Sequence, residues 1–147
     1  MTMLVRECLR KAPITVPPEC TLEEAARLMG HHGVGSLLVV SGGELLGIVT
    51  DRDIVLRAVG TGQSLDAHIA TIMSKQPTVI QGSADVFEAI KVLRDAGVRR
   101  LPVLEDTEIA GIITYDDLTV WLVLELGAIT TPIAGELLHS TTDHSFR

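Results

Sequence analysis

Apolar residues recur with helical spacing in two segments of the chain. In each segment they fall at i, i+3, i+4 and i+7, the pattern of a helix with one buried face. The two sets are Leu22, Ala25, Ala26 and Met29, and Val86, Ala89, Ile90 and Leu93. Each helix also has predicted end signals. They are the capping-box pairs Thr21 with Glu24 and Asp85 with Glu88 at the starts, and Gly33 and Gly97 at the ends.

Short apolar runs follow each predicted helix and are typical of β-strands. Residues 36–40 and 45–50 form one pair of runs and residues 100–104 and 109–114 the other, each pair joined by a polar turn. Their nearly continuous apolar character predicts sheets that are covered on both faces. A short extended stretch precedes each helix, at 14–16 and 78–80, and a second helix is expected after Thr50 and after Thr114.

These two sets of elements are copies of one another. At an ungapped offset of 64, residues 11–53 match their counterparts at 13 of 43 positions, against roughly three expected from composition. The sequence therefore predicts an α/β (α+β) fold with the order β-α-β-β-α twice. We expect copies at 5–60 and 68–126 to share one core, because about 55 residues make a marginal independent fold. Residues 127–147 are expected to be a partly disordered extension.

Composition narrows the class of protein. Hydrophobic residues make up 46% of the 147 residues, charged residues 21%, and the net charge is −7. Such a chain lacks the basic surface of a nucleic-acid binder, and no apolar run reaches the about 18 residues of a membrane span. The first residues lack the apolar core of a signal peptide, so we expect a cytoplasmic protein.

Chemistry-bearing residues outside the repeat motif are few. Cys8, Cys20 and the pair His31-His32 lack ligand-spaced partners, so no metal site is expected. No catalytic triad, phosphate-binding loop or nucleophile elbow is recognisable, so we expect the protein not to be an enzyme.

One motif with nucleotide-binding chemistry occurs once in each copy. Gly47–Asp53 and Gly111–Asp117 both read Gly, apolar, apolar, Thr, x, x, Asp where a strand meets a helix. Amides at a helix start and a Thr hydroxyl can bind phosphate oxygens, and a carboxylate can accept from ribose hydroxyls. The same Thr-x-x-Asp spacing also suits a helix cap, and the motif alone does not separate the two interpretations.

This motif, the element order and the segment Gly97–Val103 make each copy resemble a CBS domain, so the chain resembles a tandem CBS pair, or Bateman module. The resemblance implies a pseudo-two-fold pair with two sites for adenosine-containing ligands between the copies. Each implied site combines the first strand and the helix-to-strand segment of one copy with the Thr/Asp motif of the other. Site B would contain Thr50, Arg52, Asp53, Thr78, Val79, Ile80, Arg99, Arg100, Leu101 and Pro102. Site A would contain Thr15, Val16, Gly35, Ser36, Leu37, Leu38, Thr114, Asp116 and Asp117.

The charges predict different roles for the two sites. Site B has Arg52, Arg99 and Arg100, whereas site A has Asp116 in place of Arg52 and no arginine. A unit-charge contact is worth about 1 to 4 kcal/mol near a protein surface, so we expect site B to hold a phosphorylated ligand. The alternative for Arg99 and Arg100 is a solvated turn.

The resemblance also implies a function. It indicates a regulatory sensor of an adenine nucleotide, with or without Mg²⁺, that acts as a homodimer on an unidentified effector protein. The apolar side of residues 118–126 fits either a dimer interface or the chain's own core. The alternatives are a ligand-free dimeric scaffold, or a CBS pair that binds NAD, S-adenosylmethionine or a metal.

Overall fold

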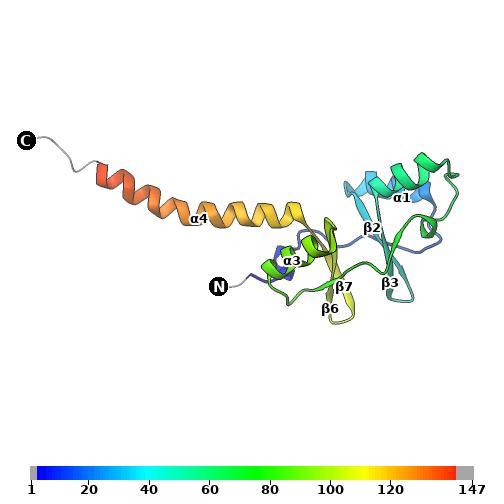
Figure 1. Cartoon of the computed structure of the whole chain (residues 1–147), viewed down its shortest axis with the longest axis horizontal. Coiled ribbons are helices and arrows are strands. Elements are labelled where there is room, and N and C mark those ends of the chain that lie inside the picture. Colours follow the sequence, from blue (N-terminus) through cyan, green and yellow to red (C-terminus); the bar gives the residue numbers. More distant parts are fainter. Residues whose placement is uncertain (1–2, 142–147) are drawn as a thin grey trace, which may run out of the picture.

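The computed structural model describes residues 3–141, and side-chain environments through residue 130. Both copies have the predicted element order (Figure 1). The first contains β1 (Thr15–Val16), α1 (Leu22–His32), β2 (Ser36–Ser41), β3 (Glu44–Thr50) and α2 (Asp51–Asp53), which continues as a π-helical turn, Ile54–Ala58. The second contains β5 (Ile80–Gln81), α3 (Val86–Ala96), β6 (Arg100–Glu105), β7 (Glu108–Thr114) and α4 (Tyr115–Thr141).

The ends of helices α1 and α3 follow the sequence signals, with one exception. Thr21 and Glu24 form the predicted capping box, and Gly33 and Gly97 end the helices with φ of 61° and 65°, the left-handed region that favours glycine. The capping box predicted for Asp85 is wrong. Its side chain instead accepts from the Phe87 amide at 2.6 Å, which satisfies the helix start without a contribution from Glu88.

The strands form two sheets, one in each copy. In each sheet the two long strands are antiparallel, β2 with β3 and β6 with β7, and the short strand before the helix runs parallel to the first of them. Alternate residues point to opposite faces. Leu37 and Val39 face the core of their own copy, as Leu101 and Val103 do in the second.

The opposite face of each sheet is turned toward the other copy. It carries Ser36 and Leu38 in β2, and Arg100 and Pro102 in β6, and Arg100 bonds to Ser36 across the two copies. Leu38 and Pro102 are both buried. The prediction that the sheets are covered on both faces is therefore confirmed: a helix covers one face and the other copy covers the second.

The two copies do not share one core, contrary to the sequence-based expectation. The buried apolar residues fall into two clusters with no common member, one around Leu22, Leu37 and Val49 and the other around Val86, Leu101 and Ile113. Each cluster is completed by a segment from outside its own repeat, which gives about 55 residues enough apolar partners to form a core.

These completing segments are exchanged between the copies. Val5 and Cys8, in a 3-10 helix at Val5–Cys8, lie in the second cluster, whereas Ile69 and Ile72, from the start of the second copy, lie in the first. The same segment of the second copy supplies β4 (Ser74–Lys75), which pairs with β3 of the first copy. Val5 and Ile69 are 64 residues apart, so the exchange obeys the same pseudo-two-fold symmetry as the repeat.

Helix α4 extends away from both copies (Figure 1). It continues to Thr141, and residues 142–147 lie outside the described residues. The expected partly disordered extension at 127–147 stays a prediction. No helix of the described chain is long and apolar enough to cross a membrane.

Candidate functional site

The two Thr-x-x-Asp motifs form helix caps in the structure. Asp53 Oδ2 accepts from the Thr50 amide at 2.9 Å, and the Asp53 amide donates to Thr50 Oγ1 at 3.2 Å. Asp117 Oδ2 accepts from the Thr114 amide at 3.0 Å, and the Asp117 amide donates to Thr114 Oγ1 at 3.1 Å. One carboxylate oxygen of each aspartate is thus committed to the cap, and Oδ1 remains for another partner.

The first motif opens into a cleft between the copies, which we call cleft B. Its volume is about 540 Å³. It contains six of the ten predicted site B residues, together with others that surround them. The lining is Ile48, Thr50, Asp51, Arg52, Asp53, Arg57, Ser74, Pro77, Thr78, Gly97, Val98, Arg99, Arg100, Thr114, Tyr115 and Asp116.

Four predicted site B residues do not line cleft B. Ile80, Leu101 and Pro102 are buried, and Ile80 and Leu101 pack in the second core cluster. Val79 is exposed and lies outside the lining. Of the segment 78–80, only Thr78 reaches the cleft. The structure therefore brings together the polar half of the predicted site and leaves its apolar half outside the cleft lining.

The second motif opens into a smaller cleft, cleft A, with a volume of about 390 Å³. Five predicted site A residues line it: Gly35, Ser36, Thr114, Asp116 and Asp117. Leu37 and Leu38 are buried and do not line it. The remaining lining residues are Arg10, Lys11, Ala12, Pro13, Ile14, Gly33, Val34, Arg100 and Ile112.

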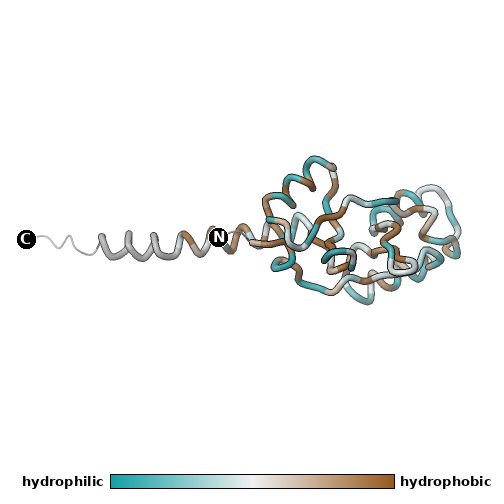
Figure 2. Tube along the Cα trace, turned by 90° about the horizontal axis from the view of Figure 1, so that it is seen from below, coloured by the Kyte–Doolittle hydropathy of each residue, from teal (hydrophilic) through white to brown (hydrophobic). Residues whose placement is uncertain are grey.

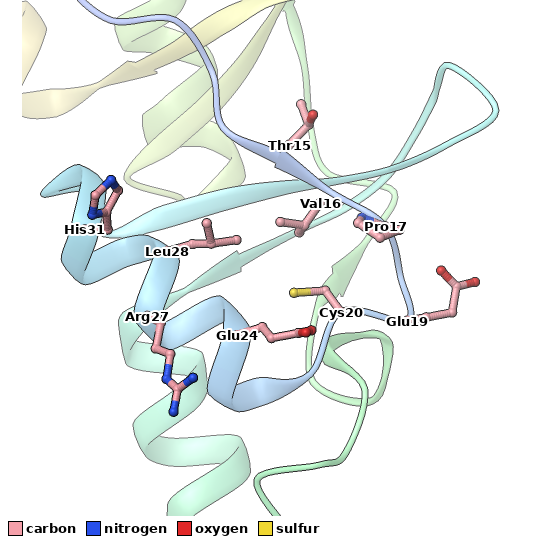
Figure 3. Close-up of a pocket in the computed structure, with 9 residues that line it drawn as sticks. All are labelled: Thr15, Val16, Pro17, Glu19, Cys20, Glu24, Arg27, Leu28 and His31. Atoms are coloured by element: carbon pink, nitrogen blue, oxygen red, sulfur yellow. The ribbon is translucent and has the colours of Figure 1, made fainter.

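Thr15 and Val16, also predicted for site A, line a different cavity. It has a volume of about 770 Å³ and lies along β1 and α1, where Val16, Cys20 and Leu28 face one another (Figure 3). Burial raises the pKa of the Cys20 thiol, and the charge of Glu24 raises it further. The thiol stays protonated at neutral pH, which disfavours nucleophilic chemistry there.

Arg10 and Lys11 are the functional candidates that the sequence analysis missed. They precede Pro13 and lie at the same repeat positions as Ser74 and Lys75. The identity of Lys11 and Lys75 was visible in the repeat and could have indicated that this segment approaches a cleft. These two cations line cleft A, which reduces the predicted difference in positive charge between the two sites.

The two clefts have equal formal lining charge. Four arginines and three aspartates line cleft B, and three cations and two aspartates line cleft A, which gives +1 in each case. Arg100 is counted in both. The net charge of the lining therefore does not separate the clefts, although Arg52 and Arg99 line cleft B and not cleft A.

The two aspartates differ in their nearest cation. Arg57 Nε lies 3.5 Å from Asp53 Oδ1, and the same guanidinium donates to the Ile72 carbonyl at 3.0 Å. Trp121 occupies the equivalent position in the second copy. Within the described part of the chain, Asp117 Oδ1 has no hydrogen-bond or ion-pair partner. Residues 3–130 also contain no cluster of His, Cys, Asp and Glu suited to a metal ion.

Comparison with known proteins gives relatives for both copies. The model of the CBS domain matches residues 5–60 and 69–124. An uncharacterised protein of Methanopyrus kandleri is 38% identical over 117 residues, which cover 78% of this chain and 60% of that protein's length.

Solved structures share the fold. The CBS domain pair of protein MJ0100, in complex with 5′-methylthioadenosine and S-adenosyl-L-methionine, is 25% identical with a TM-score of 0.77, covering 85% of this chain and 99% of that one. A CBS domain protein from Pyrobaculum aerophilum, complexed with AMP, is 23% identical with a TM-score of 0.75, covering 86% and 99%. With two family matches over most of its length, each containing one Thr-x-x-Asp motif, the chain belongs to the CBS domain family as a tandem pair.

Proposed function

We propose that this CBS pair is a regulatory sensor that binds an adenosine-containing ligand in clefts A and B. The observation that carries the proposal is that each cleft joins a Thr/Asp motif from one copy to residues of the other. The complexes of the MJ0100 pair and of the Pyrobaculum protein with adenosine compounds support the ligand class. Because the ligand contacts residues of both copies, its binding can change how the copies pack against each other. The size of that change is limited by the difference in the ligand's affinity for the two arrangements.

Cleft B is the proposed site for a phosphorylated ligand such as AMP, ADP or ATP, with or without Mg²⁺. It is the larger of the two clefts, and Arg52 and Arg99 line it but do not line cleft A. Asp53 accepts from the ribose hydroxyls, and the Thr50 region with the arginines binds the phosphate. The exposed parts of Arg52 and Arg99 are not tied to a carboxylate in residues 3–130, which leaves their donors available.

The assembled form of the sensor is proposed to be a homodimer that acts on an effector protein. Apolar side chains are exposed on α4 and on the π-helical turn, including Leu56, Val123 and Leu126, and the tube drawing shows the hydrophobic stretch of α4 outside the body of the two copies (Figure 2). A helix with apolar residues on all sides is normally buried against a partner. The two free cysteines suit the reducing cytoplasm, where we place the protein.

A ligand-free scaffold is the second candidate. The observation that favours it is that each Thr-x-x-Asp motif forms a reciprocal helix cap from its own residues. In this alternative the clefts are by-products of packing, and only the dimer surface is functional.

Thermal shift measurements separate these two functions. The protein is melted with AMP, ADP, ATP, NAD and S-adenosylmethionine, each with and without Mg²⁺. A ligand at 100 times its Kd adds about 2.7 kcal/mol to the free energy of unfolding, or roughly 5 to 10 °C. GTP at the same concentration is the control for nonspecific phosphate binding. A flat response to every adenosine compound contradicts the sensor and leaves the scaffold.

A further inference from the structure

The side chain of Arg100 lies where the two copies meet. Arg100 and Ser36 begin β6 and β2, and they occupy the same repeat position, 64 residues apart. Arg100 Nη1 donates to Ser36 Oγ at 3.4 Å. Equivalent residues that touch each other lie beside the pseudo-two-fold axis, because that axis relates one to the other. The guanidinium is therefore between the clefts, and it lines both of them.

A glycine gives Arg100 access to cleft A. A Cβ atom on Gly35 would lie 3.1 Å from Arg100 Nη2 and 3.4 Å from Nη1, which is tighter than an ordinary van der Waals contact. In the second copy the position of Gly35 is occupied by Arg99, which lines cleft B alone. The missing side chain in the first copy thus makes room for the guanidinium.

The guanidinium of Arg100 is also available to an anion. Arg100 is half-buried, and among residues 3–130 it has no carboxylate oxygen within 4.0 Å. Asp51 Oδ2 lies 3.1 Å from the same Gly35 Cβ position without forming an ion pair. The hydrogen bond from Arg100 to the Ser36 hydroxyl is long, at 3.4 Å, and its acceptor is uncharged, so a phosphate would be a much stronger acceptor.

We propose that Arg100 is a phosphate-binding residue that both clefts share, and that ligands in the two clefts compete for it. The proposal rests on the adenosine binding proposed above. The first copy has Ser36 where the second has Arg100, so no second arginine serves the other cleft from this position. The first phosphorylated ligand engages Arg100, and the second binds without it, at least about tenfold more weakly. An uncharged adenosine ligand makes no use of Arg100 and does not compete.

The test measures AMP binding by calorimetry in chains with a single working cleft. Asp117→Ala removes the ribose acceptor of cleft A, and Asp53→Ala removes that of cleft B. We expect Arg100→Ser to weaken AMP binding at least about tenfold in both single-cleft backgrounds. In the intact chain the same substitution weakens the first binding step only, because the second ligand already lacks Arg100.

Two controls define the result. Arg99→Ser is expected to weaken AMP binding only where cleft B works, and Arg100→Ser is expected to leave the binding of adenosine itself unchanged. If loss of a cap unfolds an alanine variant, Asp53→Asn or Asp117→Asn is used in place of that variant, because asparagine keeps an amide oxygen at the cap.

Several outcomes overturn the shared role while leaving adenosine binding intact. One is an effect of Arg100→Ser on AMP binding in only one of the two single-cleft variants. Another is no AMP binding by the Asp53→Ala variant, in which only cleft A works. The third is that Arg100→Ser weakens both binding steps in the intact chain. If neither AMP nor adenosine binds the unaltered chain, the proposed function itself is wrong.

Discussion

Asp53 and Asp117 occupy the same position in the two repeats but have different surroundings. Both cap a helix through Oδ2, yet only Asp53 has an arginine, Arg57, beside its second oxygen. A ribose that binds Asp53 shares this carboxylate with the guanidinium. Both residues line cleft B, so a ligand there meets the carboxylate of Asp53 and the cation of Arg57 together.

Substitution of each aspartate tests the order of the two clefts. We expect Asp53→Ala to remove most of the thermal shift produced by AMP, and Asp117→Ala to remove less, because Arg52 and Arg99 line cleft B alone. Each variant loses the same kind of cap, at a cost of about 0.5–2 kcal/mol, so each serves as the stability control for the other. The shift is measured against the ligand-free melting temperature of the same variant. Equal losses from the two variants would contradict the ranking.

The polar site residues were more predictable than the apolar ones. The Thr/Asp motifs and the arginines carry their chemistry in their residue types, and the structure places them in the clefts. Leu37 and Leu101 are adjacent in sequence to cleft residues, but strand alternation turns them into the cores. Arg10 and Lys11 were missed because they reach cleft A through tertiary packing, and the repeat gave only the identity of Lys11 with Lys75 as a signal.

Among the elements, the segment at Val5–Cys8 has the least expected position. It belongs by sequence to the first repeat and by packing to the second, where the Val5 amide donates to the Ala84 carbonyl at 2.9 Å. Helices α1 and α3 and the four long strands were predicted from periodicity within one or two residues. The exchanged segments were not, because their partners lie far away in the sequence.

Truncation of Val5 tests this exchange. Val5 is fully buried, so Val5→Ala is expected to reduce the free energy of unfolding by roughly 1–3 kcal/mol. Urea denaturation measures the loss, and hydrogen exchange locates it. Amides of α3 should lose protection more than those of α1.

The neighbouring Arg6 supplies the control. Its side chain is half-exposed and forms only a 3.7 Å ion pair with Glu105, so Arg6→Ala should change stability by less than about 1 kcal/mol. Greater loss of protection in α1 than in α3 after Val5→Ala would show that the segment packs on the first copy.

For the molecule as a whole, the exposed apolar surface of α4 makes the oligomeric state testable. Val123 is 61% exposed and Leu126 is 53% exposed, and burial of such residues against a second chain favours association. We expect the unaltered protein to be a dimer by light scattering, and the Val123→Glu, Leu126→Glu double variant to be a monomer. Leu65→Glu, at an exposed apolar residue in the linker, should remain dimeric. A monomeric unaltered protein, or a dimeric double variant, would rule out this interface.

The exchange of segments has a consequence for how the chain is made. Chains are synthesised from the N-terminus, and domains generally begin to fold as they emerge from the ribosome. The first repeat has a complete core only after Ile72 has emerged, and Val5 has its full set of neighbours only after Leu118. Nearly the whole body of the protein must therefore leave the ribosome before its first ten residues reach their final place.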